Sequence, residues 1–295
     1  MFPVNCGSHS DYQNFVLKNL RKYYPDPNSI ARSTWDIIDR FWNLDLSYTD
    51  ELLRSKYSVF GPASRTPSCM QKSYLLSIDF KLTPLTDWAA QLKINPLHAI
   101  LSGFDVSSTP GVGTFYDFLN RLWNFDVAHL SPHLKPLTEK IKKPKSKGSK
   151  ADPIEKVTVD QLISVLQETS FSLDQQPYGS LFKLYRNEFL DSSVSRGLID
   201  PDNLSLAGDD TPVVTSHRQR QKRVCDCFYH GYDLYMLVAA NFESNLPIFP
   251  LLNPASKHDS HGFLETMRMN SFLPEFNIKK LLLDSAHDAT PHFEA

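Results

Sequence analysis

The spacing of apolar residues changes near residue 203, and this change determines the predicted fold class. Upstream, segments such as 11–24 repeat apolar residues three or four positions apart, which is typical of helices. Downstream, a helix is predicted over 259–271, and short apolar segments typical of strands lie around it, at 203–209, 231–242, 246–252 and 278–284. The order strand, strand, strand, helix, strand predicts an α+β chain with a helical first part and a sheet in the second.

The helical first part contains signals for helix ends. Thr83 precedes Pro84 as an N-cap precedes a first-turn proline, and Gly103 follows the apolar pattern as a helix stop. Thr114 and Asp117 imitate a capping box that opens a helix with a buried aromatic stripe. Short helices joined by turns are compatible with a helix-turn-helix DNA-binding module, and also with helical pairs that never contact DNA.

A lysine-rich segment, "KPLTEKIKKPKSKGSK", separates the two parts of the chain. It has seven lysines between 135 and 150 against the single Glu139. One interpretation is a solvated hinge; the other is that Lys142, Lys143 and Lys145 lie along a phosphate backbone and release its counterions. The predicted organisation is a helical domain over 1–134, a linker over 135–156, a helical connection over 157–200 and a second domain over 201–295.

Composition excludes several classes of protein. With 295 residues, 41% of them hydrophobic, the chain can bury packed cores. It has no run of 18 apolar residues and no signal peptide, so we expect a cytoplasmic protein without a membrane partner. Four cysteines are too few for a disulfide framework, and no Gly-rich phosphate loop occurs, which argues against a nucleotide cofactor.

Two aspartates, Asp209 and Asp284, each follow a short apolar run directly. An aspartate at the end of a strand is often a turn residue, because its side chain caps its own backbone. Carboxylates at the ends of strands are also the ligands that hard divalent cations need in phosphodiester chemistry. The element order is one in which the first and fourth strands, and hence these two carboxylates, can converge.

Around these aspartates the chain resembles the DDE-type transposases of bacterial insertion sequences. Four stretches follow the blocks of that family in order: "GDDTPVVTS", "GYDLYMLVAA", "LPIFPLLNPASKHDS" and "LLLDSAHDA". Upstream, "SRTPSCMQKSYLLSIDF", "WAAQLKINPLHAILSGF" and "PGVGTFYDFLNRLW" resemble its helical N-terminal region. The blocks touch most of 57–124 and 204–289. The resemblance implies a ribonuclease H-like α/β catalytic domain with a mixed sheet.

The resemblance also implies a chemistry. Asp209 and Asp284 would be catalytic ligands of Mg²⁺ or Mn²⁺, which would activate water and later a DNA 3′-hydroxyl at the terminal inverted repeats of a mobile element. A homodimer on DNA is a further expectation. The family's third acid is a glutamate on a downstream helix, and because only eleven residues follow Asp284, the chain resembles a C-terminally truncated copy, inactive alone. The alternative is a non-catalytic DNA-binding remnant.

Other polar residues near these blocks have two interpretations each. Asp210 and Asp288 would support the metal ligands, or cap turns and helices. The basic cluster after the first strand would contact DNA, or be a solvated loop. His258 and His261 would bind a metal, but Asp259 between them is more simply a helix N-cap. Cys225 and Cys227 are expected to be reduced surface thiols. The basic cluster comprises Arg218, Arg220, Lys222 and Arg223.

Overall fold

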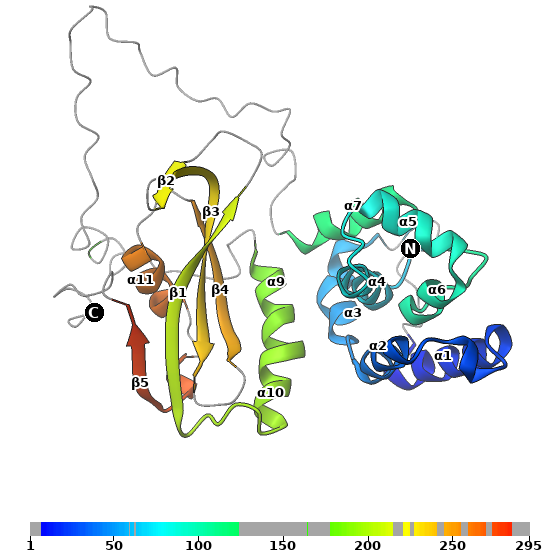
Figure 1. The fold of residues 1–295 in the computed structure, drawn as a ribbon, viewed down its shortest axis with the longest axis horizontal. Coiled ribbons are helices and arrows are strands. Elements are labelled where there is room, and N and C mark those ends of the chain that lie inside the picture. The colour runs from blue at the N-terminus through cyan, green and yellow to red at the C-terminus, as the bar shows by residue number, and fades with distance from the viewer. Residues whose placement is uncertain are drawn as a thin grey trace, which may run out of the picture. The chain divides into compact units, whose positions relative to one another are not determined.

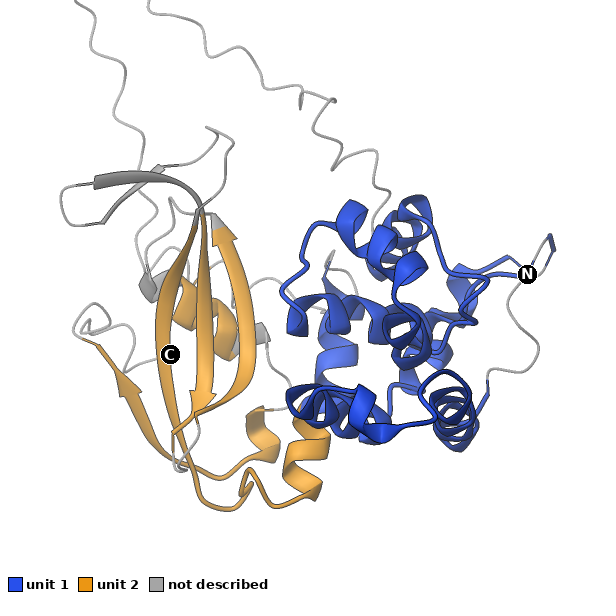
Figure 2. Cartoon of the chain, turned by 45° about the vertical axis from the view of Figure 1, so that its right-hand side comes forward, with its two compact units in different colours: residues 1–134, 174–189 blue, residues 135–173, 190–295 orange. Residues whose placement is uncertain are grey.

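The chain folds into two compact units. The computed structural model describes residues 7–58, 60–61, 63–123, 164, 178–214, 221–224, 227–240, 245–254, 259–269 and 273–284. Unit 1 comprises residues 1–134 and 174–189, and unit 2 comprises residues 135–173 and 190–295 (Figure 2). The predicted fold class is confirmed, because a helical N-terminal region precedes a mixed sheet with helices.

Unit 1 is helical. Its first helix begins with a capping box: Asp11 donates its backbone N–H to Ser8 Oγ at 3.2 Å, and the Asp11 carboxylate accepts the backbone N–H of Ser8 at 2.7 Å. In chain order the helices are α1 (His9–Tyr23), α2 (Arg32–Asn43), α3 (Tyr48–Leu53), α4 (Pro67–Asp79), α5 (Leu85–Ile94), α6 (Pro96–Ser102), α7 (Val112–Leu122) and α9 (Gly179–Leu184), with 3₁₀ turns at Pro27–Ser29 and Arg54–Lys56.

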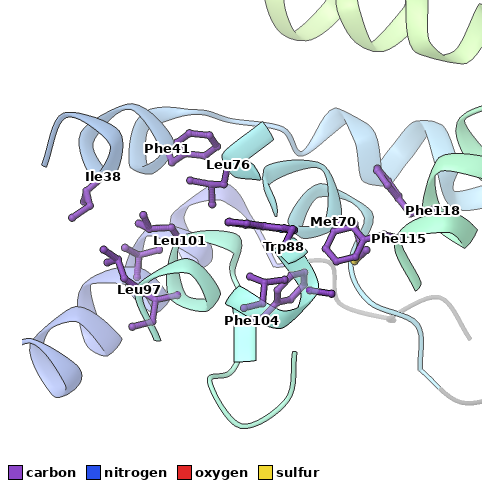
Figure 3. Packing of buried hydrophobic residues seen from close by; sticks show 14 of the residues in the cluster. Ile38, Phe41, Met70, Leu76, Trp88, Leu97, Leu101, Phe104, Phe115 and Phe118 are labelled. Atoms are coloured by element: carbon purple, nitrogen blue, oxygen red, sulfur yellow. The ribbon is translucent and has the colours of Figure 1, made fainter. Parts of the chain in front are cut away.

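The core of unit 1 lies around Trp88, whose side chain is fully buried among apolar residues from several helices (Figure 3). Its indole Nε1 donates a hydrogen bond to Ser73 Oγ at 2.9 Å, so the one polar group of the ring is paired. Phe115 and Phe118 of α7 are also buried, which confirms that the aromatic stripe predicted for this helix is core.

The predicted helix ends have mixed outcomes. Gly103 ends α6 in the left-handed conformation, with φ 83°, and a Cβ there would lie 2.7 Å from Cys69 Sγ, so the helix stop is confirmed. The other two predictions are wrong. Pro84, not Thr83, is the N-cap of α5. Thr114 lies inside α7, because the backbone already turns into the helix at Gly111.

Residues after the lysine-rich segment return to unit 1. Leu184 of α9 joins the hydrophobic core, and the following π-helical turn, Tyr185–Leu190, contains the buried Glu188. The Glu188 carboxylate accepts hydrogen bonds from Thr49 Oγ1 and Gln71 Nε2, each at 2.7 Å. The region predicted as a helical connection therefore contributes packing to unit 1. The first part of that predicted connection, residues 157–171, lies outside the described residues except for Ser164.

Unit 2 is built on a mixed sheet in the order β4-β3-β1-β5 (Figure 1). β5 runs parallel to β1, whereas β3 is antiparallel to both β1 and β4. A short additional strand, β2, pairs with the beginning of β3. The elements are α10 (Asp191–Ser195), β1 (Leu204–Val214), β2 (Gln221–Val224), β3 (Cys227–Ala239), β4 (Leu246–Pro254), α11 (Asp259–Met269), a 3₁₀ turn (Leu273–Glu275) and β5 (Ile278–Leu283).

Helix α11 covers one face of this sheet and contacts β1, β3 and β4. Tyr235 of β3 lies at the centre of that face. A Cβ at Gly262 of α11 would be 3.1 Å from its ring, and one at Gly208 of β1 would overlap its hydroxyl oxygen. The close approach therefore requires glycine on both sides. Among the helices in the described part of the chain, none is long and apolar enough to cross a membrane.

Candidate functional site

Asp209 and Asp284 occupy neighbouring positions on two parallel strands. The last register pair of β1 and β5 is Gly208 with Leu283, and the two aspartates are the next residue on each chain. Neighbouring strands lie about 4.8 Å apart, and register partners project on the same face of a sheet. Both aspartates are exposed. The fold thus brings two aspartates, 75 positions apart in sequence, to the positions that directly follow the last register pair of β1 and β5.

That face is the one opposite α11. Leu206 and Gly208 are buried on the side of the helix, and alternation along the strand turns Asp209 the other way. Glu265, the acidic residue of α11 nearest in sequence to β5, is buried with the helix that covers the other face. It therefore does not join the two aspartates, and the aspartate edge, defined here by Asp209 and Asp284, has no ligand from α11 among the described side chains.

The prediction that the first strand ends at Asp209 is wrong. β1 continues to Val214, and each residue from Asp209 onward has a register partner in β3. What ends at Asp209 is the pairing with β5. From there β1 has one neighbour in the described sheet, so Pro212, which cannot donate a ladder hydrogen bond, is tolerated. Asp209 is thus held by a continuing strand while the flank left by β5 opens to solvent.

The carboxylate of Asp209 is oriented by its own backbone. Asp210 donates its N–H to Asp209 Oδ1 at 2.8 Å, which leaves Oδ2 for another partner. The side chain of Asp210 belongs to the opposite face, because its register partner is Tyr235, which packs under α11. The predicted support of Asp209 by Asp210 is therefore made by the peptide N–H and not by the second carboxylate.

The two carboxylates fit a hard divalent cation with open coordination positions. Mg²⁺ is usually bound through one or two carboxylates and keeps several waters or substrate phosphate oxygens. A closed zinc site needs four ligands, and within the described residues no three His, Cys, Asp or Glu side chains are grouped to hold a metal ion. The aspartate edge could therefore hold Mg²⁺ or Mn²⁺ if water or substrate oxygens complete the coordination, but the described residues do not supply the four ligands of a structural zinc site.

For several predicted site residues, the side chain or the whole residue lies outside the described part of the chain. Lys222 and Arg223 belong to β2, opposite Tyr229 and Phe228 of β3, but their side chains are outside the description. Cys227 begins β3, and Asp259 and His261 belong to α11, with the same restriction. The remaining candidates lie outside the described residues altogether: Lys142, Lys143, Lys145, Arg218, Arg220, Cys225, His258 and Asp288.

Buried polar residues of unit 2 were missed by sequence reasoning. Asp233 of β3 and Asn253 of β4 are register partners, both buried on the face that α11 covers. The signal was present in "GYDLYMLVA", since alternation places Asp233 on the same face as Tyr235.

Unit 1 also buries charged groups that were not anticipated. Burial raises the pKa of Glu188 and of Asp50, and burial lowers the pKa of Lys72 to about 8. No local pattern reveals these groups, because Glu188 meets Thr49 across 139 positions of sequence.

Two exposed carboxylates in parallel register are therefore the feature of unit 2 with the clearest chemical capacity. Comparison of the chain with family models, with curated proteins and with solved structures finds no match.

Proposed function

We propose that this chain is a metal-dependent DNA strand transferase of the DDE transposase class, acting at the ends of an insertion sequence. The observation that supports it most directly is the parallel register of β1 and β5, in which Asp209 and Asp284 are the residues that follow the paired Gly208 and Leu283. The ordered resemblance of the blocks around both aspartates supports the same class.

The negative charge of the aspartate edge also favours binding of a cation. Like charges at directly opposite positions of neighbouring strands destabilise a sheet. A divalent cation between Asp209 and Asp284 would remove that repulsion, and both residues are exposed. The strands supply rigidity: β1 is paired with β3 on both sides of Asp209, so the first ligand is held on a fixed backbone.

Asp209 and Asp284 would hold Mg²⁺ or Mn²⁺, which in this class supplies activation of the attacking oxygen and stabilisation of the leaving one. The protein's own contribution is positional. Asp209 Oδ1 stays on the Asp210 N–H, so Oδ2 is presented in one direction, and Asp284 follows the last residue of β5 paired with β1. The opposite face is covered by α11, so a DNA strand would approach from the exposed face.

A second candidate function is DNA binding without strand cleavage. It is favoured by the absence of a third carboxylate grouped with the pair in the described part of the chain.

The two functions are separated by incubating the protein with supercoiled plasmid that carries the inverted repeats flanking its gene, in Mg²⁺ or Mn²⁺. The proposal expects the two aspartates to suffice for metal-dependent nicking, in contrast to the inactive truncated copy that the resemblance implies. The nicking should fall about 10²- to 10³-fold in Asp209→Asn and Asp284→Asn, comparable to other losses of electrostatic stabilisation. Asp202→Asn, an exposed aspartate of the same unit, is the matched control.

Metal binding gives an independent readout. Mn²⁺ should raise the thermal unfolding midpoint of unit 2 in the wild type and in Asp202→Asn, and not in the two site variants. Intact but retarded duplex in every metal, with no Mn²⁺ effect on the midpoint, would replace the enzyme proposal with the binding one.

A further inference from the structure

A polar pocket lies in unit 1, remote in sequence from the aspartate edge. It has a volume of about 280 Å³, near the lower end for small-molecule pockets. We call it the arginine pocket and define it by the polar residues Ser64, Arg65, Thr114, Asp117 and Arg121. Its size suits one small group and not an extended ligand.

The arginine pocket is built on a rigid base. Helix α7 contributes Thr114, Asp117 and Arg121, whose spacing of three and four positions places them on one helix face. The apolar lining includes Met70 and Phe118, both 1% exposed and part of the core of unit 1. The polar groups are therefore held on packed elements, which lowers the cost of ordering them around a ligand.

The two arginines hold positive charge with no ion pair to a carboxylate in the described part of the chain. Arg65 Nη2 donates to Ser108 Oγ at 2.8 Å, and the Arg121 guanidinium lies 4.4 Å from the centre of the Tyr57 ring. Both side chains are half-buried. The ion pairs recorded for the described residues include His9 with Asp45 and Arg40 with Asp79, and none recorded there involves a pocket arginine. Two arginines against Asp117 leave an excess positive charge at the pocket.

We propose that the arginine pocket binds a phosphate group. Guanidinium groups match the oxygens of phosphate with paired N–H donors, and the hydroxyls of Ser64 and Thr114 supply further donors. Thr114 also lies in the first turn of α7, where the helix dipole favours an anion. The phosphate belongs either to a nucleic-acid backbone or to a small phosphate ester. The arginine pocket contains neither Asp209 nor Asp284, so the phosphate proposal remains valid even if the aspartate edge has no activity.

The test titrates the full chain with inorganic phosphate at constant ionic strength, and separately with a 20-base-pair DNA duplex. Arg65→Gln and Arg121→Gln remove the two cations, and Asp117→Asn removes the competing carboxylate. Arg40→Gln is the matched control, because Arg40 belongs to the same unit and already pairs with Asp79 at 3.4 Å. A thermal melt of each variant verifies folding. If Arg121→Gln is unstable without its contact to Tyr57, Arg65→Gln alone decides.

We expect phosphate affinity to fall about tenfold in each arginine variant, to rise in Asp117→Asn and to stay unchanged in Arg40→Gln. If the ligand is a DNA backbone phosphate, duplex affinity falls as well and the salt dependence decreases by about one counterion. If the ligand is a small ester, only the phosphate titration changes. The proposal is overturned if neither arginine variant binds phosphate or duplex more weakly than Arg40→Gln does.

Discussion

His98 shows how burial sets the behaviour of a single residue. Its ring lies 4.4 Å from Phe80 and 5.1 Å from Trp88, centre to centre, and Nε2 lies 3.3 Å from Asn95 Nδ2. Within the described residues Nδ1 has no hydrogen-bond partner. Burial lowers the pKa of His98 to about 4, so the imidazole is neutral at pH 7. Sequence patterns do not reveal this, because the aromatic neighbours come from separate helices.

Acid should therefore destabilise unit 1 through His98. The folded-state pKa lies below the ordinary value of 6.5, so the stability due to neutral His98 is fully present above pH 6.5 and is lost as the pH falls through about 4. Relative to His98→Phe, the wild type should lose up to about 3 kcal/mol of unfolding free energy over that range. Urea unfolding at pH 7.5, 5.5 and 4.5 measures it, and equal losses in both proteins would contradict the assignment.

At the scale of elements, the packing of α9 into unit 1 depends on tertiary contacts with other helices. The sequence predicted a helical connection over 157–200 but gave no information on which elements it packs against. In the structure Phe182 and Leu184 are buried, and Glu188 bonds to Gln71 across 117 positions of sequence. A contact at that separation joins two segments that are distant in sequence, so the local sequence of neither segment predicts it.

Leu184→Ala should consequently destabilise unit 1, although residue 184 follows the lysine-rich segment. Removing a buried leucine side chain costs about 2–4 kcal/mol. All four tryptophans lie between residues 35 and 123, so tryptophan fluorescence reports on unit 1 during urea unfolding. Leu198→Ala, which truncates a side chain that is 50% exposed, is the control and should have little effect. A Trp-detected midpoint unaltered by Leu184→Ala would show that α9 does not stabilise the helical core.

At the scale of the whole molecule the two units have separate cores. Unit 1 packs around Trp88, and unit 2 packs Tyr235 between the sheet and α11. Because the tryptophans all belong to unit 1, fluorescence follows that unit alone, whereas far-ultraviolet circular dichroism follows the backbone of both units; a dichroism change without a fluorescence change therefore reports on unit 2. Each unit can therefore be perturbed and observed by itself.

Gly208→Ala tests this separation. The new Cβ would overlap the Tyr235 hydroxyl and lie 3.0 Å from Cζ, so unit 2 should lose about 1–3 kcal/mol. We expect the circular dichroism transition of unit 2 to move while the Trp-detected midpoint stays. Adding Tyr235→Phe, which removes the overlapped oxygen, should recover part of the loss. Gly113→Ala, with no atom within 4 Å of its Cβ, is the control and should slightly stabilise unit 1. Parallel shifts of both transitions in Gly208→Ala would contradict two independent units.

Sequence by itself determined the α+β class, the order of the strands around α11, the helix stop at Gly103 and the choice of Asp209 and Asp284 as candidate ligands. These depend on local periodicity and backbone preference, which each segment contains. Tertiary structure alone decided that β1 continues past Asp209, that Asp210 faces α11, that α9 joins unit 1, and that Arg65 and Arg121 line one pocket. Each of these depends on a partner distant in sequence: for example, β1 continues because β3 pairs with it to Val214.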